Sequence, residues 1–128
     1  MKKIKEDIIT NDSNENPIKN IYTYDQVYKN TLSYFNADEL AATTWINKYA
    51  MKNKHGEYLE LGPDQMHKRM AKEFANIEHV YANKVHLNGN AKLLSEYGQS
   101  RDFLDNDKIY NYFKDFKYII PQGSVMAG

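Results

Sequence analysis

The chain has 128 residues and a mass of 15.0 kDa, with seventeen basic residues, seventeen acidic residues and no cysteine. This length predicts one domain, and the formal net charge of zero argues against a dedicated nucleic-acid binder. The lack of cysteine excludes a disulfide framework, a zinc ribbon and any thiol chemistry performed by this chain alone.

Residues 1–20 are predicted to be a flexible polar leader, because the stretch Thr10–Pro17 holds no core-forming residue. No apolar run follows Met1, so we do not expect a signal peptide. No segment reaches the roughly 18 consecutive apolar residues that span a bilayer. A cytoplasmic location is therefore expected.

Helical signals begin just after Ile21. Thr23 and Gln26 have the spacing of a capping box, and the residues that follow place one apolar face on a helix: Val27, Tyr28, Thr31, Leu32 and Phe35. Asn36 is predicted to cap a second helix by accepting from the backbone N–H of Glu39. That helix should run to about Lys52 and bury Leu40, Ala41, Trp45, Ile46, Tyr49 and Ala50.

A turn with Gly56 at positive φ should precede the third helix. Tyr58–Leu61 could be extended, and Pro63 suits the first helical turn, where its missing N–H costs nothing. The core stripe of this helix is predicted to be Met66, Met70, Phe74, Ile77 and Tyr81.

The last third of the chain predicts shorter elements. Ala91–Tyr97 could form a short helix with Leu93, Leu94 and Tyr97 inward. Asp105 or Asn106 should cap a final helix that contains Ile109, Tyr112, Phe113 and Phe116. Tyr118–Ile120 is a β-type run, and a loop over Pro121–Ser124 follows it. The fold class is mainly α: a helical domain over 21–116, and a strand and loop over 117–128 whose partner strands are missing.

Side chains that could carry chemistry are few. The four histidines show no i, i+4 pair of the kind found in helical zinc sites. Asp64 and His67 lie on neighbouring turns and could hold a metal. The simpler explanation is that Asp64 complements the helix dipole in the first turn, while His67 is either solvated or packed between helices. Lys68, Arg69 and Lys72 could bind phosphate or nucleic acid, or form a solvated helix face.

Four blocks resemble one known family in the expected order. Tyr34–Ala42, Trp45–Ala50 and Pro63–Glu78 look like the N-terminal helical region of the ribonucleotide reductase large, catalytic chain. Phe116–Gly128 is similar to the start of that family's catalytic barrel. The resemblance covers about residues 22–128.

The resemblance implies that this chain is the leading segment of a reductase that converts ribonucleotides to deoxyribonucleotides by thiyl-radical chemistry. The redox cysteines of the family lie beyond the matching blocks, so the chain alone is expected to be inactive. Its expected partners are the remainder of the large chain and, in the complete enzyme, a ribonucleotide. The radical source is left open between adenosylcobalamin and a metallocofactor subunit, and no metal is expected on this chain.

The same resemblance places a loop beside the substrate. Gln122, Gly123 and Ser124 are its candidate substrate-binding residues, through backbone amides and the serine hydroxyl. The helical blocks match a scaffold and supply no catalytic residue. The alternative is a small non-enzymatic helical interaction module, with Lys68, Arg69 and Lys72 placed on nucleic acid.

Overall fold

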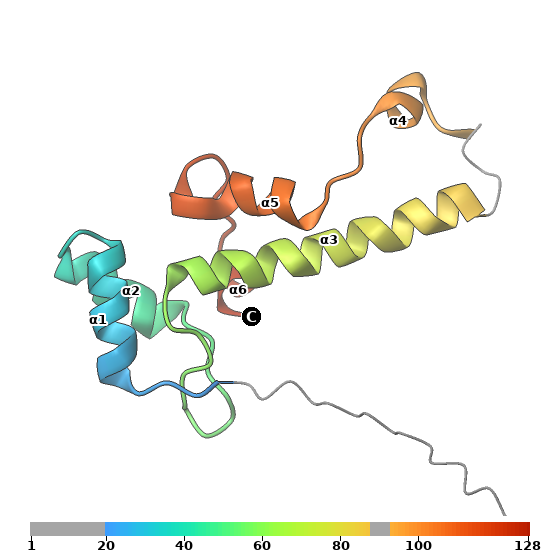
Figure 1. The fold of residues 1–128 in the computed structure, drawn as a ribbon. Helices are drawn as coiled ribbons and strands as arrows, with labels where there is room; N and C mark the ends of the chain where they lie inside the picture. Colours follow the sequence, from blue (N-terminus) through green and yellow to red (C-terminus); the bar gives the residue numbers. More distant parts are fainter. Residues whose placement is uncertain (1–19, 88–92) are drawn as a thin grey trace, which may run out of the picture.

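Helices make up nearly all the regular structure of the described residues. The computed structural model describes residues 20–87 and 93–128, which form six α-helices and one 3₁₀ turn (Figure 1). Their bounds are α1 (Tyr24–Tyr34), α2 (Glu39–Lys48), α3 (Pro63–Leu87), α4 (Glu96–Ser100), α5 (Asn106–Phe113), the 3₁₀ turn η2 (Lys114–Phe116) and α6 (Ser124–Ala127). The described residues hold no strand, only isolated bridges from Tyr58 to Tyr22 and to Lys52. The mainly helical class is confirmed.

Helix α1 begins as its sequence predicts. Thr23 accepts from the backbone N–H of Gln26 at 3.3 Å, and the Gln26 side chain accepts from the N–H of Thr23 at 2.9 Å. This reciprocal pair is the capping box, which satisfies two amides that the helix leaves free. On the inner face of α1, Val27 and Thr31 are buried.

The turn between α1 and α2 differs from the prediction. Asn36 lies in the left-handed region, with φ 53°, and closes α1 instead of capping α2. Its N–H donates to the carbonyl of Ser33, and the N–H of Ala37 donates to that of Leu32 at 2.9 Å, as in a Schellman motif. The cap of α2 is Asp38, which accepts from the N–H of Ala41. Helix α2 ends at Lys48, four residues before the predicted end at Lys52.

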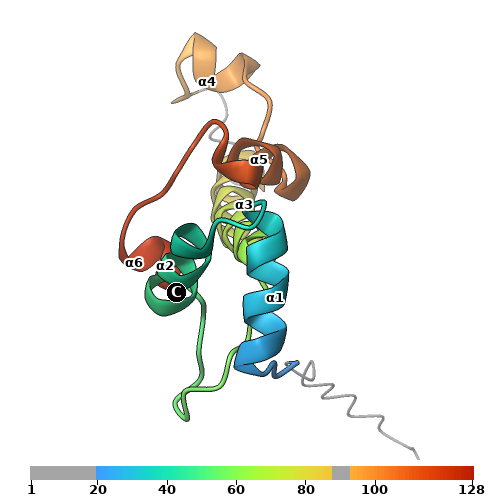
Figure 2. The ribbon, with the colours of Figure 1, turned by 90° about the vertical axis from the view of Figure 1, so that its left-hand side faces the viewer.

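Helix α3 is the longest helix, and α5, η2 and α6 pack against it. Helix α5 lies along its middle, and α1 and α2 lie together at its first end (Figures 1 and 2). The indole N–H of Trp45 donates to the sulfur of Met66 at 3.2 Å, which ties α2 to α3. The buried core is Val27, Trp45, Ile46, Ala50, Met66, Met70, Ala71, Ile109, Phe113 and Met126.

The predicted apolar stripe of α3 is confirmed over its first half only. Met66 and Met70 are buried, whereas Phe74, Ile77 and Tyr81 are 40%, 54% and 61% exposed. A helix of 25 residues is about 37 Å long, and the core covers only its first turns. Leu40, predicted to be buried on α2, is 77% exposed.

The short helices also bury less than predicted. Leu93 and Tyr97 are exposed, not inward, and residues 88–92, where the short helix was predicted to begin, lie outside the described part. Asp105 caps α5 as expected and accepts from the N–H of Lys108 at 2.8 Å. Helix α5 buries Ile109 and Phe113 and leaves Tyr112 exposed.

The final segment does not form the predicted strand. Tyr118–Ile120 is irregular and exposed, because a strand needs a neighbour to pair with and the described residues supply none. The segment 124–127, within the predicted loop and barrel start, is the helix α6. The predicted leader, apart from Asn20, lies outside the described residues.

Candidate functional site

The predicted substrate loop lies on the surface at the start of α6. Gln122, Gly123 and Ser124 are all exposed. Gly123 has φ 58° and ψ −129°, a conformation that side chains disfavour, so glycine suits the turn into α6. The three residues are neighbours in the chain, but the structure does not gather them around one cavity.

Ser124 lies at a cavity beside the loop. This hollow of about 230 Å³ runs between α3 and α6 and is lined by Arg69, Met70, Glu73, Phe74, Ile77, Ser124, Val125 and Gly128. The surface of this hollow is almost entirely apolar, although Arg69, Glu73 and Ser124 are among the residues that line it. Such a lining suits an apolar group.

Helix α6 is fixed beneath the loop by two contacts. The side chain of Met126 is buried in the core, and its carbonyl accepts a hydrogen bond from Nη2 of Arg69. Arg69 in turn pairs through Nε with the carboxylate of Glu60. Sequence reasoning placed Arg69 in a basic surface cluster and missed both contacts.

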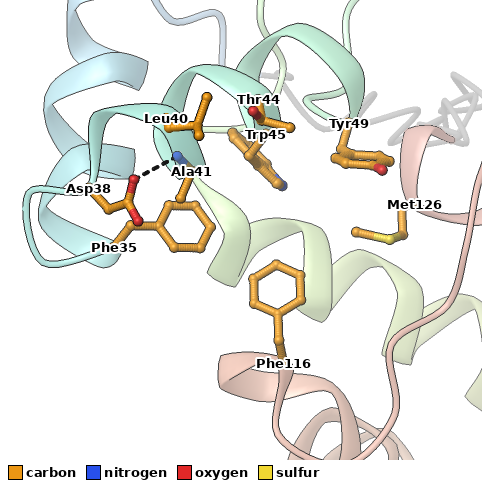
Figure 3. A pocket seen from close by; sticks show the side chains of 9 residues that line it. All are labelled: Phe35, Asp38, Leu40, Ala41, Thr44, Trp45, Tyr49, Phe116 and Met126. Atoms are coloured by element: carbon orange, nitrogen blue, oxygen red, sulfur yellow. Dashed lines mark hydrogen bonds between the residues drawn. The ribbon is translucent and has the colours of Figure 1, made fainter.

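A second hollow lies on α2, and Figure 3 shows the side chains around it. We call it the α2 pocket. It has a volume of about 360 Å³, and its lining is Phe35, Asp38, Leu40, Ala41, Thr44, Trp45, Tyr49, Phe116 and Met126. The Asp38 carboxylate accepts a hydrogen bond from the N–H of Ala41 (Figure 3). The rest of the lining is mainly apolar and aromatic. The pocket suits an apolar side chain or ring and offers no acid–base pair.

Polar groups gather around His67, on the side of α3 that faces η2. We call His67, Tyr34, Asp64, Tyr110 and Asp115 the His67 cluster. His67 is 1% exposed, and its ring meets the edge of Phe116 with centroids 4.6 Å apart. Of the two explanations that the sequence left open, solvation or packing between helices, the structure shows packing. The Tyr34 hydroxyl donates to Asp115 at 3.3 Å, and the Tyr110 hydroxyl donates to Asp64.

Burial and charge set the protonation of this cluster. Burial lowers the pKa of the His67 imidazole, against the opposing charges of Asp64 and Asp115. Burial alone would raise the pKa of the Asp64 carboxyl, but hydrogen bonds from Lys68 and Tyr110 outweigh it and lower that pKa. The hydrogen bond to Asp64, and then burial, raise the pKa of Tyr110 to about 12. Burial, and then the charge of Asp115, raise the pKa of Tyr34.

The Asp64–His67 pair is poorly arranged for a metal. One carboxylate oxygen of Asp64 accepts from Tyr110 and the other pairs with Lys68 at 2.8 Å. Among the side chains that the structure describes, in residues 20–83 and 93–128, no group of three or more histidine, aspartate or glutamate residues could hold an ion. A metal would first have to displace both partners of Asp64.

The basic residues of α3 face different surroundings in the structure. Lys68 is exposed but pairs with Asp64, and Arg69 points inward to Glu60. Lys72 is exposed. The three cations therefore do not form one open basic face.

Comparison with protein families, with curated proteins and with solved structures finds no match for this chain. Within the part of the chain that the structure describes, no helix is long and apolar enough to cross a membrane.

Proposed function

We propose that this chain is the N-terminal segment of a ribonucleotide reductase large chain. It supplies a helical scaffold and the loop Gln122–Ser124 to the reduction of ribonucleotides to deoxyribonucleotides. The redox cysteines and the radical source come from the rest of the enzyme, because this chain has no cysteine. Alone it is inactive.

The observation that carries the proposal is the placement of that loop. Gln122, Gly123 and Ser124 are exposed, yet the helix that follows them is fixed to the core through Met126. An exposed loop on a fixed support is the arrangement that binding loops need. The sequence resemblance supplies the identity of the ligand.

The apolar surface beside the loop gives further support. Phe74 and Ile77 on α3 lie next to Ile119 and Pro121 at a hollow of about 470 Å³. Ile119, Ile120 and Val125 are also exposed. Contiguous exposed apolar surface marks a site of interaction with another protein surface, and the remainder of the large chain would cover it.

Complementation tests the proposal directly. The chain is mixed with a reductase large chain that lacks the matching region, together with the radical source and a dithiol reductant, and deoxyribonucleotide formation is measured. We expect activity from the mixture and none from either part. Ser124→Ala should lower the activity, whereas Ser33→Ala, an exposed serine on α1, should not. A mixture that neither associates nor reduces nucleotides would refute the proposal.

The alternative of a nucleic-acid module receives less support from the geometry. Arg69 is engaged with Glu60 and Met126, and Lys68 with Asp64. Binding to single- or double-stranded nucleic acid at low salt, falling steeply as salt rises, would favour it over the reductase proposal.

A further inference from the structure

Arg69 joins three segments that are far apart in the sequence. It lies on the second turn of α3, its Nε pairs with Glu60 in the loop before α3, and its Nη2 donates to the carbonyl of Met126 in α6. The other carboxylate oxygen of Glu60 accepts from the N–H of Met51 at 3.2 Å. One guanidinium therefore connects the 51–60 loop, the central helix and the C-terminal helix.

The pair is largely withdrawn from water. The side chains of Arg69 and Glu60 are 19% and 5% exposed, in contrast to Lys68 and Asp64 at 62% and 44%. An exposed ion pair contributes little, whereas removing one member of a buried pair leaves a charge without its partner and is strongly destabilising. Removing either Glu60 or Arg69 should therefore destabilise the segments that this ion pair joins.

The chemistry of the guanidinium is needed at this position. Arginine presents its N–H groups in a planar fork. Nε can therefore donate to the Glu60 carboxylate while Nη2 donates to the Met126 carbonyl. A lysine ammonium is a compact charge on a flexible stem and lacks this fixed division of donors. Substitution by lysine keeps the charge and loses the geometry.

Helix α6 depends on such external contacts. It has four residues, and a helix of this length does not form alone because nucleation is unfavourable. Its end fits closely: a Cβ added at Gly128, which has φ 93°, would lie 2.5 Å from Cε of Met51. Met126 in the core and Arg69 at its carbonyl are what keep α6, and hence the turn at Gly123, in place.

We propose that Arg69, held by Glu60, is the positioning residue of the loop Gln122–Ser124. Its guanidinium binds the backbone of α6 two residues after Ser124 and so fixes the exposed loop for a ligand. The inference rests on the proposed function only for the identity of that ligand, a ribonucleotide.

Hydrogen exchange on the full chain tests the positioning. The amides of Met126 and Gly128 donate to the carbonyls of Gly123 and Ser124, so their protection reports the order of α6. We expect Arg69→Gln and Glu60→Gln to lower that protection by about tenfold or more, and Arg69→Lys to lower it less. Lys68→Gln, which removes the neighbouring exposed ion pair, is the matched control and should leave it unchanged.

An internal reference separates this effect from global unfolding. The amide of Ala42 in α2 donates to the carbonyl of Asp38 and does not involve α6. Loss of protection at Gly128 with Ala42 unchanged shows that Arg69 orders α6, which the positioning role requires. Equal loss at both sites, or no loss at Gly128 in Arg69→Gln, overturns it.

The complemented enzyme tests the functional part. We expect Arg69→Lys to raise the KM for ribonucleotide several-fold with a smaller fall in kcat, because a misplaced loop weakens binding first. Altered exchange with unchanged KM would overturn the positioning role. Failure of the unsubstituted chain to complement would refute the proposed function, while the exchange results would still decide whether Arg69 orders α6.

Discussion

Removal of the Phe116 ring is the sharpest test of the packing between η2 and the rest of the molecule. Phe116 is half-buried, stacks on Phe35 with centroids 6.0 Å apart and meets the ring of His67 at 4.6 Å. Half of the burial free energy of a phenylalanine side chain is about 1 kcal/mol, and two aromatic contacts add about 0.5–1 kcal/mol each. Phe116→Ala should therefore lower the free energy of unfolding by about 2–3 kcal/mol.

Urea unfolding measures this loss. Trp45 is the only tryptophan and lines the α2 pocket together with Phe116, so its fluorescence reports the same region. With an ordinary denaturant slope the midpoint should fall by about 1–2 M. Tyr118→Ala removes an exposed ring and is the control, with an expected change within about 0.5 kcal/mol. Equal midpoints for Phe116→Ala and the unsubstituted chain would refute the packing argument.

Three further changes test the turns, the cap and the buried histidine. Ala37→Gly should raise the free energy of unfolding in urea by about 0.5–1 kcal/mol, because the left-handed φ of 66° strains alanine and not glycine; a loss of stability would contradict that conformation. Thr23→Ala should cost about 1 kcal/mol in the same assay through loss of the capping box, and no change would mean that the cap does not form in solution. Burial keeps the pKa of His67 below its ordinary value, against Asp64 and Asp115, so the unfolded chain takes up a proton first as the pH falls. The contribution of neutral His67 to the free energy of unfolding is therefore complete above about pH 6.5. It is lost as the pH falls through the lower pKa that His67 has in the folded state. Urea unfolding gives the free energy of unfolding at pH 7.5 and at pH 5.5. The difference between the two values should be smaller for His67→Gln than for the unsubstituted chain, and equal differences would exclude this linkage.

Local signals in the sequence were sufficient for the starts of helices. Thr23 and Asp105 cap α1 and α5 as predicted, and Pro63 opens α3. Each of these signals acts within one turn of chain, where the side chain meets the backbone amides that it satisfies. Gly56, with φ 81°, is a fourth local feature predicted correctly.

Features that depend on distant segments were not predictable in this way. Asparagine suits both an N-cap and a left-handed helix end, and Asp38, two residues after Asn36, takes the cap of α2. The apolar spacing of α3 continues through Phe74 and Ile77, but how much of it is covered depends on where α5 packs. Tyr118–Ile120 has the composition of a strand without a strand beside it.

The support of the candidate loop was not predictable for the same reason. The exposed loop Gln122–Ser124 was placed by resemblance, whereas its support by Arg69 joins residues 57 positions apart, which no spacing pattern reveals. One signal was present: Glu60 lies between two leucines in a short apolar run. An acidic residue there needs a partner if the run is buried.

The two left-handed turns have a consequence for how the molecule folds. Asn36–Ala37 ends α1, and Asp115–Phe116, at φ 57° and 52°, follows α5. Each such residue costs of order 1–2 kcal/mol in isolation, and the compensating contacts join one turn to the other, through Phe35 on Phe116 and Tyr34 to Asp115. Hydrogen bonds within the first turn offset part of its cost, but the contacts between the two turns form only when both turns are in place. The contacts between the two turns should therefore form late in folding and in a single step. Substitutions in either turn should then speed unfolding far more than they slow folding.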